Sequence, residues 1–172
     1  HFEQLGLVRD AARVHLRLLH AYWSVRPRER PYELIEGVCR SGLELLANHG
    51  TTISTSTRRH LFCFYLKQWI NALWARNLFT HAKPIIDEWT KRLREKMPAS
   101  VAPRYVRSVL ELEGPEKALA AAAASLRVLS SRQLAVRLEL ERSLAIHNQG
   151  EYERALDGLR SIVDSSLLST RD

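Results

Sequence analysis

Apolar residues recur every three or four positions through nearly the whole chain, and this spacing constrains the fold more than any other feature. It is clearest over residues 5–24, where Leu, Val, Ala and Trp return on one side of a 3.6-residue period. Proline, glycine and short polar stretches interrupt the pattern at intervals. The spacing predicts an all-α protein without strands, with helices over about 5–24, 32–48, 58–76, 78–97, 102–112, 115–129, 131–148 and 151–168.

Local signals place several helix ends. Gly50 follows the second predicted helix, where a left-handed C-cap favours glycine. Thr55 or Thr57 is expected to cap the third helix, since a hydroxyl can accept a hydrogen bond from a free backbone N–H. Pro115 is expected as the first residue of the sixth helix, where its missing N–H has no helical partner to lose.

The breaks between the predicted helices are short, so neighbouring helices are expected to lie antiparallel and form four hairpins. The hairpins span about 1–49, 57–97, 101–130 and 131–169. At 172 residues the chain has the length of one ordinary domain. We therefore expect a single helical-repeat domain over 1–172, belonging to a longer protein.

A small residue recurs once per hairpin. Ala82, Ala118 and Ala155 are 36 and 37 residues apart, and Phe79 and Tyr152 each precede one of these alanines by three positions. Two antiparallel helices approach to about 8–10 Å only where the side chains at their crossing are small. These alanines are therefore predicted to lie at helix crossings, with the two aromatic side chains packed over the turns.

This pattern resembles the tetratricopeptide repeat, a helix–turn–helix unit of about 34 residues that stacks into a solenoid. The best match is 134–168, where Gly150, Tyr152, Ala155 and Leu159 stand at the family's turn glycine, aromatic, small and large apolar positions. The copies over 58–130 are degenerate. The resemblance implies a right-handed α-solenoid whose first helices line a concave groove for a partner. By that analogy the groove positions to test are Arg13, Arg17, Lys67, Asn71, Arg104, Arg107 and Arg142.

Positive charge is concentrated in the first 100 residues. The chain holds 26 Lys and Arg against 19 Asp and Glu, and residues 1–100 contain 16 of the former and 9 of the latter. Arg9, Arg13 and Arg17 form a stripe on one helix face, where like charges disfavour the helix by a few tenths of a kcal/mol per pair. We expect an acidic partner to offset this, or the neighbouring helix that carries Glu33, Glu36 and Glu44.

No catalytic constellation is visible, so an enzyme is not expected, and neither are a metal or a cofactor. Cys39 and Cys63 are isolated, no glycine-rich phosphate loop is present, and His15 and His20 are five residues apart, which does not suit a metal pair. The aromatic residues of 58–93 are expected to form a core rather than a base-stacking platform. They are Phe62, Phe64, Tyr65, Trp69, Trp74 and Trp89.

The favoured hypothesis is a scaffold or adaptor module that assembles complexes by binding a peptide or helix of another protein, with an acidic segment as the expected ligand. Two alternatives remain: weak, salt-dependent nucleic-acid binding by the basic first 100 residues, and a structural spacer within a giant helical-repeat protein. No apolar run reaches membrane-spanning length and no signal peptide is visible, so an intracellular protein of cytoplasm or nucleus is expected. Self-association through Leu167 and Leu168 is a further expectation.

Overall fold

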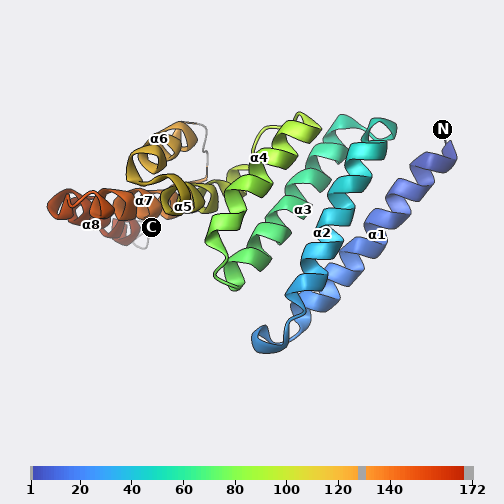
Figure 1. Cartoon of the computed structure of the whole chain (residues 1–172), viewed down its shortest axis with the longest axis horizontal. Coiled ribbons are helices and arrows are strands. Elements are labelled where there is room, and N and C mark those ends of the chain that lie inside the picture. Colours follow the sequence, from blue (N-terminus) through green and yellow to red (C-terminus); the bar gives the residue numbers. More distant parts are fainter. Residues whose placement is uncertain (1, 128–130, 169–172) are drawn as a thin grey trace. The chain divides into compact units, whose positions relative to one another are not determined.

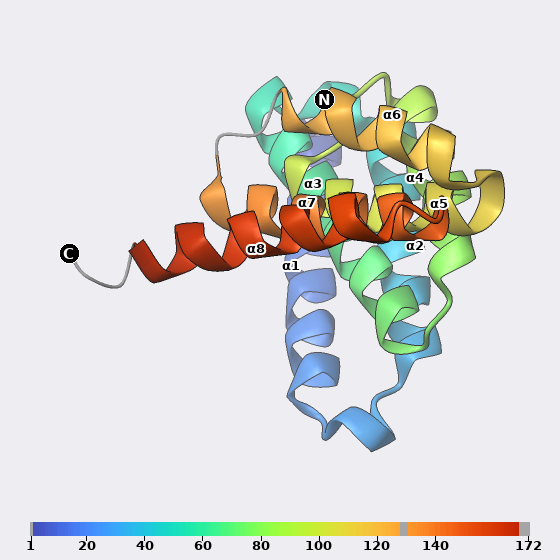
Figure 2. The same ribbon diagram turned by 90° about the vertical axis from the view of Figure 1, so that its left-hand side faces the viewer.

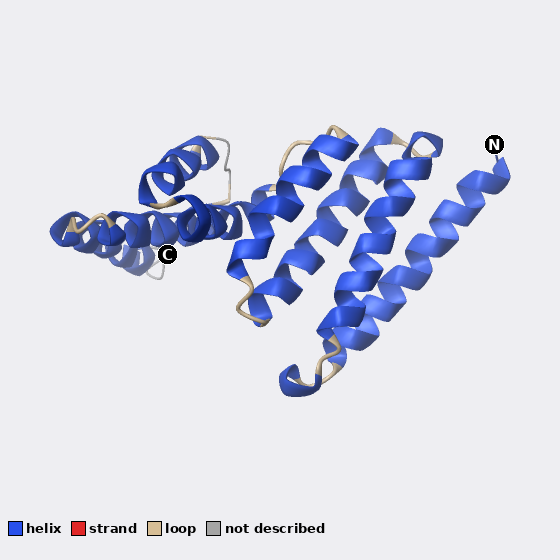
Figure 3. Cartoon of the chain, in the orientation of Figure 1, coloured by secondary structure: helices blue, strands red, loops and turns tan. Residues whose placement is uncertain are grey.

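The computed structural model describes the backbone of residues 2–127 and 131–168, and the side chains of residues 8–127 and 131–163. Within those ranges every regular element is helical, as Figure 3 shows, and the predicted all-α class is confirmed. Four short 3₁₀ turns connect the helices: η1 (Pro27–Glu29), η2 (Gly50–Thr52), η3 (Phe79–His81) and η4 (Ala99–Val101). The helices are α1 (Phe2–Ser24), α2 (Tyr32–His49), α3 (Thr55–Ala75), α4 (Ala82–Leu93), α5 (Ala102–Glu113), α6 (Pro115–Leu126), α7 (Arg132–Asn148) and α8 (Tyr152–Leu168).

The chain forms two compact units, and each has its own packing. The first comprises His1–Leu78 and Pro84–Pro98, and the second comprises Phe79–Lys83 and Ala99–Asp172. In the first unit α2 lies between α1 and α3 and packs against both (Figure 1). In the second unit α7 packs against α5, α6 and α8, and α8 runs alongside α7 (Figure 2).

Aromatic side chains fill the core of the first unit. Phe62, Tyr65 and Trp69 of α3 and Trp89 of α4 are buried, which confirms the core position predicted for these four residues. The other two predicted core residues, Phe64 and Trp74, are only half-buried. Their partial exposure leaves Phe64 available to line a surface groove, which is described below.

A buried glycine lets α2 and α3 approach closely. A Cβ at Gly42 would lie 2.5–2.7 Å from three ring carbons of Tyr65, well inside van der Waals contact. The ring of Tyr65 is fully buried and its hydroxyl lies 3.2 Å from Nδ1 of His15 in α1. The Tyr65 side chain of α3 therefore contacts both α1 and α2.

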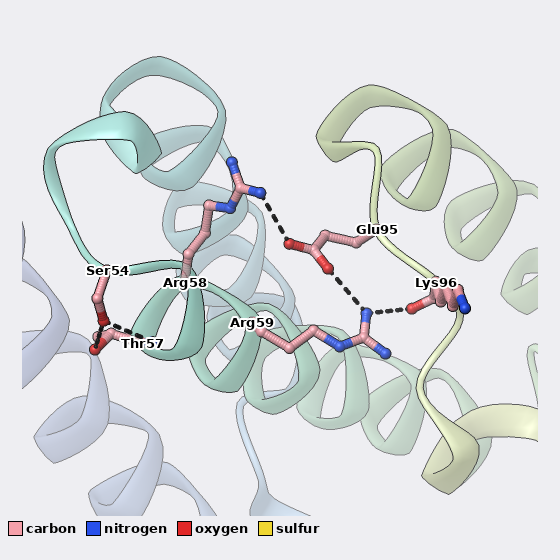
Figure 4. Close-up of polar contacts among 6 residues, drawn as sticks. All are labelled: Ser54, Thr57, Arg58, Arg59, Glu95 and Lys96. Carbon is pink, nitrogen blue, oxygen red and sulfur yellow. Dashed lines mark hydrogen bonds and ion pairs between the residues drawn. The ribbon is translucent and has the colours of Figure 1, made fainter.

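Two arginines at the start of α3 hold one carboxylate beyond the end of α4 (Figure 4). Glu95 accepts a hydrogen bond from Nη1 of Arg59 at 3.1 Å and lies 3.2 Å from Nη2 of Arg58. Arg59 also donates to the carbonyl of Lys96. Because the Glu95 side chain is only 11% exposed, these contacts replace most of the water that the carboxylate would otherwise bind.

Most helix ends lie within three residues of the predicted ones, but α4 and two caps near residue 50 differ. A helix was expected over about 78–97, whereas α4 spans only Ala82–Leu93, because residues 79–81 form η3 and Arg94 leaves the helix with a φ of +53°. Gly50 was expected in a left-handed C-cap, but its φ is −63° and the chain continues from it into η2. A Cβ at Gly50 would lie 2.9 Å from Cδ of Arg58, so a larger residue there would require the Arg58 side chain to shift. The cap of α3 is Ser54, whose hydroxyl accepts from the N–H of Thr57 at 3.2 Å, and not Thr55 or Thr57.

The core of the second unit is aliphatic. Its buried cluster is Val106, Val109, Leu110, Ala118, Ala122, Leu138 and Ala145, from α5, α6 and α7. Ser108 of α5 is buried, and its hydroxyl accepts from the N–H of Lys83 at 2.9 Å and donates to the carbonyl of Thr80. The segment Phe79–Lys83 is thereby held against α5 by a hydroxyl that satisfies a free helix N–H.

Candidate functional site

Helix α8 carries two apolar stripes, and α7 covers one of them. Ala155 is buried and a Cβ at Gly158 would lie 2.7 Å from Oγ of Ser143, so this stripe meets α7 at close range. The second stripe is Tyr152, Leu156 and Leu159, at spacings of four and three residues. These side chains are 60%, 52% and 37% exposed. Among described residues, α8 thus presents a row of apolar groups to solvent.

A groove of about 600 Å³ lies along this second stripe. Its wall on α7 includes Leu140, which is 45% exposed, and the half-buried Leu144. His147 stands near Tyr152, with ring centroids 4.9 Å apart. The complete lining is Arg107, Leu140, Glu141, Ser143, Leu144, His147, Tyr152, Ala155, Leu156 and Leu159. A concave, largely apolar surface with a few polar groups is typical of binding sites.

The polar part of the groove is a charge cluster between α5 and α7. Nε of Arg107 lies 2.9 Å from Oε1 of Glu111, and Nη1 lies 3.9 Å from Oε2 of Glu141. The Arg107 guanidinium also lies 5.4 Å from the centroid of the Phe79 ring. The distance of 3.9 Å is too long for a hydrogen bond. Arg107 is therefore committed mainly to Glu111 and Phe79.

Glu141 is incompletely satisfied, as is Arg107, whose buried Nε makes no hydrogen bond with any described group. The Oε2 atom of Glu141 is buried and accepts no hydrogen bond from any described group. Burial raises the pKa of Glu141 above its ordinary value; Arg107 opposes this shift and Glu111 adds to it. The groove therefore contains an acceptor that has lost water without gaining a full partner.

The predicted basic stripe lies on the surface of the first unit. Arg9, Arg13 and Arg17 are exposed on α1, and Arg13 pairs with Asp10 of the same helix at 3.4 Å. The carboxylates of α2 that were expected to offset the stripe bind other arginines. Glu33 and Glu36 pair with Arg76, and Glu44 holds Arg92 through two hydrogen bonds.

The remaining predicted partner-binding residues are divided between the two units. Lys67 is exposed and Asn71 is half-buried, both in the first unit. In the second unit, burial and the nearby Arg137 lower the pKa of the half-buried Arg104. Arg142 pairs with Glu139 at 3.2 Å.

Four residues that the sequence analysis singled out line the groove: Arg107, Tyr152, Ala155 and Leu159. The other residues predicted at the helix turns and crossings lie as follows. Ala82 and Ala118 are buried, and Phe79 contacts Arg107. Gly150 has a φ of +84°, which only glycine adopts readily.

Leu140, Glu141 and Leu156 were not anticipated as site residues. The second apolar stripe in the sequence of α8 could have indicated this site, because a helix that is apolar on two faces needs a neighbour on each face. The self-association expected through Leu167 and Leu168 falls on side chains outside the described residues.

A second groove, of about 470 Å³, lies in the first unit between α1 and α3. It is lined by Leu16, Leu19, His20, Trp23, Phe64 and Gln68. Nε1 of Trp23 is buried and donates to no described group. The Trp23 ring itself is covered by the Arg30 guanidinium, 5.1 Å from the ring centroid, and meets Tyr32 edge-on.

In residues 2–127 and 131–168, no three His, Cys, Asp or Glu side chains are grouped so that they would hold a metal ion. None of the helices in this part of the chain combines the length and the apolar composition that crossing a bilayer requires. No protein-family model, curated protein or solved structure matches the chain. The resemblance to the tetratricopeptide repeat therefore stays a prediction, and the groove along α8 is the strongest candidate site.

Proposed function

We propose that this chain is a protein-binding module, a scaffold or adaptor in a larger assembly, that receives a helix of another protein in the groove between α7 and α8. The observation that carries the proposal is the row of exposed apolar side chains on these two helices: Leu140, Tyr152, Leu156 and Leu159. Soluble proteins seldom expose contiguous apolar surface unless it binds something. An amphipathic helix laid in an apolar groove is a recurring mode of recognition.

The packing order within each unit supports a repeat architecture. In the first unit α2 packs against the helices before and after it, and in the second unit α7 does the same. Stacked hairpins produce this order, because each helix pair offers an apolar face to the next. We propose on this basis a right-handed, tetratricopeptide-like solenoid of four hairpins. A structural spacer within a giant helical-repeat protein would have the same architecture. In that alternative, a helix of the same polypeptide occupies the groove.

The exposed arginines of α1 favour a second binding surface. The side chains of Arg9, Arg13 and Arg17 form a positive stripe that is exposed to solvent. The acidic residues of α2 form ion pairs with Arg76 and Arg92 instead. An acidic segment of a partner protein suits this stripe, and nucleic acid is the competing ligand. Oligonucleotide binding that weakens steeply with salt would favour the competing ligand. Binding of an acidic peptide that is lost in an Arg9/Arg13/Arg17→Glu variant would favour the protein partner.

The state of the cysteines suits a reducing compartment, cytoplasm or nucleus. Cys39 and Cys63, both in the described part of the chain, are free. Burial, with a smaller contribution from Glu36, raises the pKa of the Cys39 thiol to about 12, so that it stays protonated at neutral pH. We therefore propose an intracellular location.

The experiment that tests the groove compares two matched leucine substitutions. Leu156→Glu places a charge in the groove, whereas Leu112→Glu places it on α5 outside the groove lining, at a similarly exposed position (47% against 52%). We expect proteins captured by the native chain to be retained by Leu112→Glu and lost with Leu156→Glu. Equal capture by all three forms would refute the groove as the binding surface, provided that circular dichroism shows all three folded.

A further inference from the structure

Deepening the function proposed above, and resting on it, we infer that the helix received by the α7–α8 groove carries a lysine or arginine on its apolar face, which pairs with Glu141. At this place in the groove Arg107, Glu111 and Glu141 form a charge cluster.

This cluster has one cation between two carboxylates. Arg107 is 2.9 Å from Glu111 and 3.9 Å from Glu141, so the first pair is formed and the second is incomplete. With both glutamates ionised, the cluster has a net negative charge, and Glu141 is where that charge is least compensated. The groove thus attracts a positive group at this point.

Three pairs of charged side chains near the groove leave this balance unchanged, while Arg137 stands one helical turn before Glu141 on α7, close to Arg104 of α5. Arg142 pairs with Glu139 on α7, and Arg154 and Arg160 pair with Glu151 and Asp157 on α8. Each of these pairs is neutral by itself and lies outside the groove lining. His147 lines the groove and is exposed, with its ring against Tyr152.

Covering the groove would remove the remaining water from Glu141. Its side chain is already only 19% exposed, and its Oε2 atom accepts no hydrogen bond from a described group. A purely apolar helix would therefore bury a carboxylate with an incomplete partner, which is unfavourable. An acidic helix would add repulsion. A lysine or arginine would instead bring a positive charge next to this carboxylate and offset its incomplete pairing, so the same carboxylate selects among partner helices.

The position of Glu141 also sets where the basic residue stands in the partner. Glu141 lies on α7 between Leu140 and Leu144, with Leu156 and Leu159 of α8 lining the same groove. The partner's apolar anchors at spacings of three and four residues would meet these leucines. Its basic residue would then fall within one helical turn of an anchor.

The test uses a displayed library of helical 18-residue peptides. Leucine anchors are held at positions i, i+4 and i+7, and the positions between them are randomised. The library is selected separately against the native chain, Glu141→Gln, Glu139→Gln and Leu156→Glu. Glu139→Gln is the matched control, because Glu139 lies two residues away on α7, paired with Arg142, and does not line the groove.

We expect selection on the native chain and on Glu139→Gln to enrich lysine or arginine at one position. We expect Glu141→Gln to lose that preference and to bind those peptides roughly ten- to a hundredfold more weakly. Retained binding of peptides with an uncharged residue there would show that Glu141→Gln is folded. Two outcomes would overturn this inference while leaving the proposed groove function intact. In the first, the binders depend on Leu156 but show no preference for a basic residue; in the second, they show that preference and Glu141→Gln does not change it. If no binder is lost in Leu156→Glu, the proposed groove function fails, and the inference with it.

Discussion

Replacing Gly42 by alanine is the sharpest test of how α2 and α3 pack. The added methyl carbon would lie 2.5, 2.6 and 2.7 Å from Cζ, Cε1 and Cδ1 of Tyr65. Carbon atoms in good contact are about 3.5–4.0 Å apart, so the two helices or the ring would have to move by roughly 1 Å. The ring has little freedom to move, because it is fully buried and its hydroxyl meets His15 at 3.2 Å.

The magnitude follows from two opposing effects. Alanine is the better helix former, and in a helix interior it lowers the free energy of the folded state by about 0.5–1 kcal/mol relative to glycine. Overfilling a packed core is unfavourable by about 1–3 kcal/mol. For Gly42→Ala the second effect is expected to win, with a net loss of about 1–2 kcal/mol in the free energy of unfolding.

Helix α2 supplies its own control for this experiment. Gly37 is exposed on the same helix, and no described atom lies within 4 Å of the position of its Cβ. Gly37→Ala should therefore stabilise the protein by about 0.5–1 kcal/mol. The assay is urea unfolding followed by far-UV circular dichroism. In a Tyr65→Leu background the penalty of Gly42→Ala should shrink, since the ring is gone. If Gly42→Ala stabilises the native chain as much as Gly37→Ala does, the close contact with Tyr65 does not exist.

Three further predictions concern charges and thiols. Burial raises the pKa of Glu141 in the folded chain, so over a pH range above about 4.3 the folded state keeps a proton that the unfolded state has lost. Stability therefore falls as pH rises through that range, and above it Glu141 is ionised in both states. The unfolding free energy of Glu141→Gln should therefore increase relative to the native chain from acidic to neutral pH, and a constant difference would contradict this. Glu95→Gln should lower the unfolding free energy by about 1–3 kcal/mol, because it weakens the contacts of Arg58 and Arg59 with this side chain. Asp10→Asn, which removes an exposed ion pair, should change the unfolding free energy by less than about 0.5 kcal/mol. Equal urea midpoints for the two variants would refute this difference. A thiol reagent should label the half-buried Cys63 before the fully buried Cys39, as followed by mass spectrometry of peptides, and labelling at equal rates in the folded chain would argue against this core.

Two kinds of position in the candidate site show how far sequence reasoning extends. Ala155 was identified from the sequence because a small residue at a helix crossing is a local requirement. Gly150 was identified because it stands at the turn glycine of the tetratricopeptide pattern, and its φ of +84° suits glycine. Leu156 was not identified, although it directly follows Ala155 in the sequence. Whether it is core or surface depends on which neighbours α8 has, and the sequence of α8 does not contain that information.

The amino-acid sequence by itself predicted the helices and most of their ends, since periodicity, proline and turn residues act within a few positions. It did not predict the ends of α4 or the two caps near residue 50. The buried positions of Phe62, Tyr65 and Trp89 also followed from it. Only the tertiary structure decided which charges meet. Arg58 and Arg59 share Glu95, which is more than thirty residues away, and Arg107 is committed to Glu111 and Phe79. Such pairings depend on how helices pack side by side, and the packing leaves Glu141 incompletely paired beside one uncovered apolar stripe of α8.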